Sequence, residues 1–179
     1  MHKFESPARV AELNPEVTLR KIGLKDGDVF CDIGAGPGVF TIPAAKVTSA
    51  RVYAIDVLDE MLGIIAQKCS EQGIDNVTRI LAKGYSYPIA DGECDIVFMS
   101  TVLHEVDDTD ALLKEIRRIL APQGKLVIIE LHKRETPIGP PVGHRISEEK
   151  LQQIVEGYSF AQDSLISLGE NLYLATFSK

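Results

Sequence analysis

The stretch Val29–Gly38, VFCDIGAGPG, ends an apolar run in three glycines within five positions. The β-branched and aromatic residues at its start predict a buried strand, and the apolar spacing over residues 39–47 predicts a helix after it. Gly34, Gly36 and Gly38 therefore lie in a strand-to-helix turn, where the absent Cβ permits a positive φ and a close approach of the backbone to a bound molecule. A tight connection without a ligand is the alternative that this stretch leaves open.

An acidic residue after the next strand favours a bound ligand. Residues 51–55 predict that strand, and Asp56 follows it at the spacing where a Rossmann-like fold places an acid on a ribose. The glycine pattern is Gly-x-Gly-x-Gly, whereas a dinucleotide favours Gly-x-Gly-x-x-Gly. Asp32 stands two residues before the first glycine. These details disfavour a nicotinamide cofactor.

The sequence resembles the class I S-adenosylmethionine-dependent methyltransferases, in particular the small-molecule branch that contains the quinone-biosynthesis methyltransferases. Residues 32–38 match the family's first motif, Asp-x-Gly-x-Gly-x-Gly, and Asp56 matches the acid that ends its second strand. The likeness extends from about Gly23 to the C-terminus, through residues 88–95, 102–104 and 120–124. It implies S-adenosylmethionine as the cofactor, S-adenosylhomocysteine as the product, and a small-molecule methyl acceptor.

The resemblance also implies how this chain would hold the cofactor. Gly34 and Gly36 would approach its methionine part, and Asp56 would bind the ribose. Val57 and Met61 would lie near the adenine. The full set of residues that we expect to contact the cofactor is Asp32, Gly34, Ala35, Gly36, Gly38, Asp56, Val57, Met61, Gly84, Tyr85 and Ser100.

One position departs from the family pattern. Many members place an acid after the third strand to accept the adenine amine, and this chain has Lys83 there, which cannot accept a hydrogen bond. Either the backbone of Gly84 makes the contact, which we favour, or the adenine pocket is altered or lost.

Two residues after the fourth strand are candidates for catalysis. Methyl transfer from a sulfonium is an in-line displacement, so a base is needed only if the nucleophile carries a proton. His104 has a suitable ordinary pKa, and Glu105 can orient it or accept a proton itself. The alternative is that the Val102–His104 segment only packs.

Composition limits the classes of partner. The 179 residues fit one domain, with a net charge of −7 and no run of more than two adjacent lysines or arginines, so we expect no nucleic acid partner. No apolar stretch is long enough for a signal peptide or a membrane span, and we expect a cytoplasmic protein. Cys31, Cys69 and Cys94 suit neither a metal site nor a disulfide framework and are expected to be reduced. An oligomer remains possible.

The remaining chain predicts alternating strands and helices, hence a Rossmann-like α/β fold with helices on both faces of a mostly parallel sheet. A helix begins with Asn14 as its cap, and a helix over residues 109–120 ends at a stop over residues 121–124. The resemblance implies seven strands in the order 3-2-1-4-5-7-6. The expected elements not yet named are strands over 77–81, 95–99 and 125–130, helices over 58–72 and 147–157, and a C-terminal antiparallel hairpin of 160–167 and 171–177.

Two segments are expected to flank the site of a single domain spanning residues 1–179. Residues 1–23 form an N-terminal arm and helix, in which His2–Phe4 either fold over the cofactor or fray. Residues 131–146 are too rich in proline and glycine for a simple connector and suggest a substrate loop. Their basic side chains either recognise an anion or are only solvated.

Three functions remain open from these residues. We favour a methyltransferase that acts on a small molecule. A methyltransferase-like binding module without catalysis is the alternative that Lys83 keeps open. A nicotinamide oxidoreductase is disfavoured by the glycine spacing and by the lack of room for a substrate domain.

Overall fold

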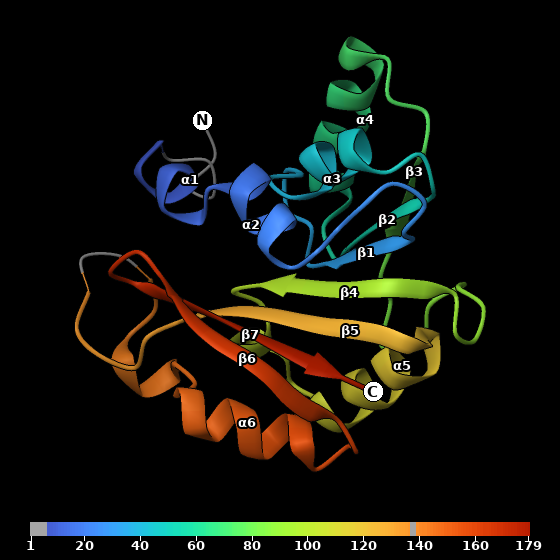
Figure 1. Cartoon of the computed structure of the whole chain (residues 1–179). Helices are drawn as coiled ribbons and strands as arrows, with labels where there is room; N and C mark the ends of the chain where they lie inside the picture. Colours follow the sequence, from blue (N-terminus) through green and yellow to red (C-terminus); the bar gives the residue numbers. More distant parts are fainter. Residues whose placement is uncertain (1–6, 137–138) are drawn as a thin grey trace.

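The computed structural model describes residues 7–136 and 139–179, which form one sheet covered by helices (Figure 1). Its strands are β1 Phe30–Ile33, β2 Val52–Asp56, β3 Val77–Leu81, β4 Cys94–Ser100, β5 Leu120–Leu131, β6 Ala161–Leu168 and β7 Leu172–Ser178. Its helices are α1 Pro7–Leu13, α2 Pro15–Lys21, α3 Thr41–Val47, α4 Asp59–Gln72, α5 Thr109–Ile119 and α6 Glu148–Glu156, with short 3-10 turns η2 Leu103–Glu105 and η3 Val142–His144.

The sheet has the strand order β3-β2-β1-β4-β5-β7-β6. Strands β1 to β5 are parallel, and β7 pairs antiparallel with both β5 and β6. The predicted fold class and strand order are therefore confirmed. The order reverses between β1 and β4, and in open α/β sheets ligands bind beyond the carboxyl ends of the strands at such a point.

Apolar clusters hold helices on the two faces of the sheet. On one face, Leu19 of α2 and Phe40 beside α3 pack toward Phe98 of β4, with the two aromatic rings 4.5 Å apart between centroids. On the other face, Ile116 of α5 and Val155 of α6 are fully buried. Strand β1 is buried along its whole length, as expected for a central parallel strand.

Two helices, α5 and α6, begin with a side-chain cap. The side chain of Asp108 accepts a hydrogen bond from the Ala111 N–H at the start of α5, and Ser147 accepts one from the Lys150 N–H at the start of α6. Asn14 is the N-cap residue of α2, as predicted, and its carbonyl accepts the Thr18 N–H at 2.9 Å. Its side chain makes no capping hydrogen bond, and its backbone is left-handed (φ 39°) at the junction between α1 and α2.

Helix α1 and the start of β5 also differ from the sequence prediction. The sequence did not predict α1, and the expected arm residues His2–Phe4 lie outside the described residues. Strand β5 begins at Leu120, not at Lys125, because Leu120 pairs with Cys94 across an irregularity in the β4–β5 ladder. The predicted stop at residues 121–124 does end α5, but the chain there already runs along the sheet.

Candidate functional site

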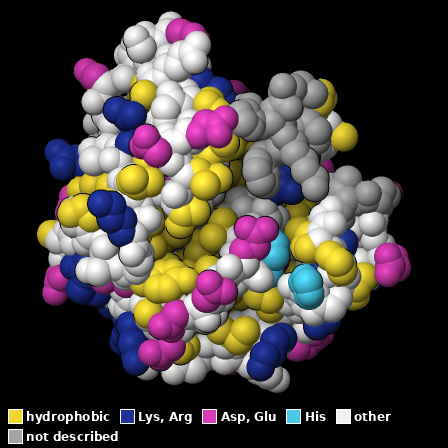
Figure 2. Space-filling view, turned by 180° about the vertical axis from the view of Figure 1, so that it is seen from behind, with side chains coloured by type: hydrophobic (Ala, Val, Ile, Leu, Met, Phe, Trp, Pro, Cys, Tyr) yellow, Lys and Arg dark blue, Asp and Glu magenta, His cyan; other side chains and the backbone are white. Residues whose placement is uncertain are grey.

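A cavity of about 460 Å³ lies beyond the carboxyl ends of the central strands. Asp32 and Ile33 of β1, Asp56 of β2 and Ser100 of β4 line it, together with the segment that follows β3, beginning at Ala82. It therefore spans the point where the strand order reverses. Figure 2 shows hydrophobic side chains gathered around a hollow on this face, with acidic and histidine side chains beside it.

The three motif glycines have different roles in the turn after β1. A Cβ on Gly34 would lie 2.3 Å from Cγ2 of Val102, and one on Gly38 would lie 3.0 Å from Cγ1 of Ile65. A Cβ on Gly36 would meet no heavy atom within 4 Å in the described structure, and Gly36 lines the cavity. All three glycines have a positive φ, as predicted, and Gly34 and Gly36 line the cavity. Packing adds a second reason for glycine at Gly34 and, less strictly, at Gly38, whereas Gly36 faces open space.

Asp56 joins the glycine turn to the end of β2. Its Oδ2 accepts the Gly36 N–H at 2.7 Å, and its Oδ1 accepts the Leu58 N–H at 2.9 Å. The side chain is buried but lines the cavity. Because a carboxylate oxygen can accept more than one hydrogen bond, both oxygens retain capacity for the hydroxyls of a ligand.

Asp32 is a buried acid at the floor of the cavity. Its Oδ2 accepts the hydroxyl of Thr41 at 2.6 Å, and its residue is 2% exposed. Burial raises the pKa of Asp32 to about 7, with the charge of Asp56 adding to the shift and the Thr41 hydrogen bond opposing it. The carboxyl group therefore titrates near neutral pH.

The segment after β3 forms one wall of the cavity. Its first backbone N–H, from Ala82, donates to the Asp56 carbonyl at 2.9 Å. Lys83, Gly84 and Tyr85 all line the cavity, with Lys83 and Gly84 exposed and Tyr85 partly buried. Within the part of the chain that the structure describes, the Gly84 N–H has no hydrogen-bond partner.

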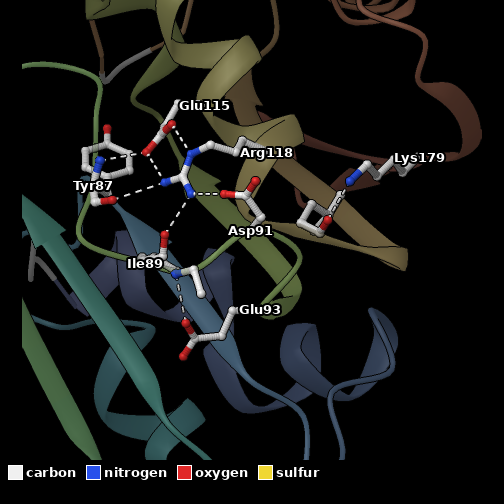
Figure 3. A network of polar contacts seen from close by, with 9 residues as sticks. Tyr87, Ile89, Asp91, Glu93, Glu115, Arg118 and Lys179 are labelled. Carbon is white, nitrogen blue, oxygen red and sulfur yellow. Dashed lines mark hydrogen bonds and ion pairs between the residues drawn. The ribbon is translucent and has the colours of Figure 1, made fainter.

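An ion pair on α5 fixes the far end of this wall (Figure 3). Arg118 donates to the carbonyls of Tyr87 at 3.1 Å and Ile89 at 2.8 Å, and to both carboxylate oxygens of Glu115. Oε1 of Glu115 also accepts the Tyr87 N–H at 2.6 Å. The α5 pair thus holds Tyr87 at both its N–H and its carbonyl. The Tyr87 side chain lines the cavity, and burial raises the pKa of its phenol.

The end of β4 carries an unusual backbone and an unpaired hydroxyl. Thr101 has a positive φ of 56°, and its N–H donates to the Ile129 carbonyl at 2.7 Å. Its Oγ1 accepts a hydrogen bond from Arg9 of α1 at 2.5 Å. Among the described residues, the Oγ of Ser100 is the buried side-chain oxygen without a hydrogen-bond partner. Because Ser100 lines the cavity, a bound molecule can supply that partner.

His104 lies behind the cavity wall and pairs with a carboxylate that the sequence did not single out. Its Nδ1 is 2.7 Å from Oε2 of Glu130, which is 1% exposed, while its Nε2 is 3.7 Å from Oε1 of Glu105. Burial lowers the pKa of His104, but the hydrogen bond and charge of Glu130 outweigh burial, so the pKa is raised. Glu105 lines the cavity and His104 does not.

The described part of residues 131–146 stands apart from this cavity. None of its residues lines the cavity. The Arg145 side chain is buried and donates to the carbonyls of Pro140 and Arg134, both at 2.8 Å. His132 lies 2.5 Å from Glu148 of α6 through Nδ1. The basic side chains of Arg145 and His132 therefore hold the segment's own backbone and α6, which gives no support to anion recognition by these two groups.

Most of the predicted site residues converge on the cavity. Ala35 and Gly38 do not line it, because they lie in the turn's packed interior. Arg9 and Leu13 of α1 do line it, and nothing in their local sequence marks them. The predicted residues that line it are Asp32, Gly34, Gly36, Asp56, Val57, Met61, Gly84, Tyr85, Ser100 and Glu105.

The other predictions concern metals, thiols and membranes. Across residues 7–136 and 139–179, no group of His, Cys, Asp and Glu side chains is arranged to hold a metal ion. Cys31, Cys69 and Cys94 are free cysteines, as predicted. Among the described helices, none has the length and apolar character needed to cross a membrane.

Known proteins share both the sequence pattern and the architecture. The curated relatives include the ubiquinone/menaquinone biosynthesis C-methyltransferase UbiE of Shewanella sp. (strain W3-18-1), 28% identical over 158 residues. That match covers 87% of this chain and 63% of the relative, so the chain spans less than two thirds of that protein. The UbiE of Marinomonas sp. (strain MWYL1) is 28% identical over 80% of this chain and 53% of its own length.

Solved structures share this architecture. A SAM-dependent methyltransferase from Aquifex aeolicus is 29% identical and superimposes with a TM-score of 0.93, covering 98% of this chain and 95% of its own. An S-adenosylmethionine-dependent methyltransferase from Mesorhizobium loti, 18% identical over 91% of this chain and 96% of its own, shares the fold with a TM-score of 0.75. Residues 31–128 match the family described as "Methyltransferase domain", which is more than half of the chain. The protein therefore belongs to the class I S-adenosylmethionine-dependent methyltransferases.

Proposed function

We propose that this methyltransferase acts on a small molecule, which binds in the cavity beside the methyl group of S-adenosylmethionine. The observation that carries the proposal is the cavity of about 460 Å³, which is lined by apolar side chains together with a few polar groups, among them Asp32, Asp56 and Ser100. Ligand pockets for small molecules have this size and lining. Leu13, Val106 and Leu112 are among the apolar lining residues, which favours an acceptor with an apolar body.

The residues of the cavity fit the cofactor. Gly36 presents backbone to open space, Asp56 offers carboxylate oxygens for the ribose, and the buried Oγ of Ser100 lacks a partner. When bound, S-adenosylmethionine supplies a methyl group on a positively charged sulfur. The chain's task is to hold the donor and the nucleophile in line and to exclude water. For a nucleophile that carries a proton, Glu105 is the proposed proton acceptor because it faces the cavity, with His104 as a positioning residue behind it.

Adenine recognition is proposed to use the backbone of Gly84. Its N–H is unpaired in the described structure, whereas Lys83 beside it is exposed. Lys83→Ala should then change S-adenosylhomocysteine affinity by less than about threefold, or roughly 0.7 kcal/mol. Lys83→Asp should tighten binding if the adenine amine lies within reach. A large loss of affinity in Lys83→Ala would make the lysine itself a ligand contact.

Calorimetric titration tests the cofactor assignment and the acceptor class in turn. S-adenosylmethionine, S-adenosylhomocysteine and NAD are titrated against the pure protein, and we expect the first two to bind and NAD to fail. Asp56→Ala should cost about 1.5–3 kcal/mol of binding free energy, the range for hydrogen bonds to a charged group. Transfer of a labelled methyl group to a panel of apolar ring compounds and to protein extracts then tests the acceptor class. Label that appears only in protein would refute a small-molecule acceptor.

A further inference from the structure

Arg9 is a charged side chain in the wall of a mostly apolar cavity. It lies on α1, which Figure 1 shows on the side of the molecule to which β4 points. Arg9 is half-buried and lines the cavity together with Leu13 of the same helix. Its hydrogen bond to Oγ1 of Thr101 is the one that the described structure gives it. A guanidinium carries a fork of several N–H donors, so most of its donors remain available to a ligand.

The two carboxylates whose charges act on Arg9 are already hydrogen-bonded to other groups. Burial lowers the pKa of Arg9, and the charges of Glu130 and Glu12 oppose that shift. Glu130 pairs with His104 at 2.7 Å, and Oε1 of Glu12 accepts the backbone N–H of Asn171 at 2.6 Å. Among the described residues, no carboxylate forms an ion pair with Arg9 within 4.0 Å. A partly desolvated cation with no ion-pair partner is costly, and an incoming anion would offset that cost.

The position of Arg9 along the cavity points to one end of the cofactor. Strand β1 lies between β2, which ends in Asp56, and β4, which ends in Ser100. A ligand with its ribose on Asp56 that passes over Gly36 reaches the end of β4 with its other end. Arg9 contacts Thr101 there, next to the unpaired hydroxyl of Ser100. The cofactor's only anionic group, its amino-acid carboxylate, is at that end of the molecule.

We propose that Arg9 is the carboxylate-binding residue of this cavity, and that the contact fixes α1 over the bound ligand. The position favours the cofactor's own carboxylate as the group bound. A carboxylate on the methyl acceptor is the other source of the same chemistry. The inference rests on the proposed function, because both molecules are ligands of methyl transfer.

The experiment compares two ligands that differ in the carboxylate. S-adenosylhomocysteine carries the amino-acid part, and 5′-methylthioadenosine keeps the adenosine and the sulfur without it. Both are titrated calorimetrically into the wild type, Arg9→Met and Arg9→Lys. Arg20→Met serves as the matched control, because Arg20 is an exposed arginine on the neighbouring helix α2 and does not line the cavity.

We expect Arg9→Met to weaken S-adenosylhomocysteine binding by about tenfold or more and to leave 5′-methylthioadenosine within about twofold. Arg9→Lys should fall between, because lysine keeps the charge and loses the planar fork. Arg20→Met should change neither affinity. In hydrogen exchange, S-adenosylhomocysteine should protect the amides of α1 in the wild type and not in Arg9→Met.

A second titration identifies an acceptor carboxylate. Benzoate and its uncharged analogue benzamide are titrated into the wild type saturated with S-adenosylhomocysteine. If Arg9→Met leaves S-adenosylhomocysteine binding unchanged, binding of benzoate but not benzamide, lost in Arg9→Met, assigns the contact to the acceptor. The proposal is overturned if neither ligand shows an Arg9-dependent carboxylate effect, or if both nucleosides weaken equally. A wild type that binds neither nucleoside refutes the proposed function instead.

Discussion

Replacing Gly34 by alanine should destabilise the fold strongly without acting through the ligand. Gly34 has a φ of 71°, a conformation that costs an alanine about 1–2 kcal/mol. The new Cβ would also lie 2.3 Å from Cγ2 and 3.1 Å from Cγ1 of Val102, a side chain with few alternative rotamers. Relieving such overpacking costs roughly 1–3 kcal/mol. The free energy of unfolding should therefore fall by about 2–5 kcal/mol.

Gly36→Ala is the matched control, since it shares the backbone strain and lacks the clash. Gly36 has a φ of 53°, and its Cβ would meet no heavy atom of the described structure within 4 Å, so only about 1–2 kcal/mol should be lost. Cofactor affinity should be affected more strongly at Gly36 than at Gly34. Gly36→Val should bind no S-adenosylhomocysteine and should still unfold cooperatively.

A double-mutant cycle separates the backbone strain at Gly34 from the clash with Val102. Val102→Ala removes the methyl groups that the new Cβ would strike, so the double variant should recover about 1–3 kcal/mol relative to the sum of the single changes. Urea unfolding followed by circular dichroism measures all four proteins. Equal destabilisation of Gly34→Ala and Gly36→Ala, with no coupling to Val102, would refute the packing argument.

Three further predictions concern buried charges. Burial raises the pKa of Asp32 from 3.8 to about 7, so between these pH values the folded protein holds a proton that the unfolded chain has released. The free energy of unfolding should therefore fall from about pH 4 to pH 7. Thermal melts should show that Asp32→Asn removes this pH dependence. Arg118→Met should lower the free energy of unfolding by roughly 2–3 kcal/mol in urea, because it leaves Glu115 buried without its partner. Glu130→Gln should lower the pKa of His104, measured by NMR titration of the imidazole, because the carboxylate is what raises it.

An exposed ion pair provides the control for Arg118→Met. Lys114→Met breaks an ion pair whose side chains are 68% and 58% exposed, so its effect should stay below about 0.5 kcal/mol. A comparable loss of unfolding free energy in Lys114→Met and Arg118→Met would contradict the role given to Arg118. Parallel pH profiles in Asp32→Asn and the wild type, or an unchanged His104 titration in Glu130→Gln, would contradict the electrostatic assignments.

The sequence predicts the elements whose signals are local. The amphipathic pattern of α5 and the buried run of β1 need no tertiary information. Helix α1 was missed because its seven residues are too short to be stable alone, and Glu12 holds it by accepting hydrogen bonds from Asn171, far along the chain. The early start of β5 depends on pairing between Leu120 and Cys94, which no local pattern reveals.

The candidate site likewise combines residues that the sequence predicts with residues that only tertiary packing brings to the cavity. Gly36 and Asp56 stand at the ends of strands that follow one another in the chain, so their convergence follows from the fold class. Arg9 reaches the cavity only through the docking of α1. Glu130 does carry a local signal, because an acid between Ile129 and Leu131 at the end of a predicted central strand is expected to be buried, and a buried acid requires a partner. That partner is His104, whose imidazole is held by Glu130 and does not line the cavity.

The placement of β7 has a consequence for the order in which the protein is assembled during synthesis. Strand β6 pairs with β7 alone, so β6 cannot join the sheet until β7 has been synthesised. Until β7 emerges, β5 presents an unpaired edge that includes the apolar run Leu126–Ile129, a template for pairing with other chains. The half that contains the glycine turn can form earlier, because β1, β2 and β3 pair only with one another and with β4. The nascent chain is thus most prone to aggregation in the interval between the synthesis of β5 and that of β7.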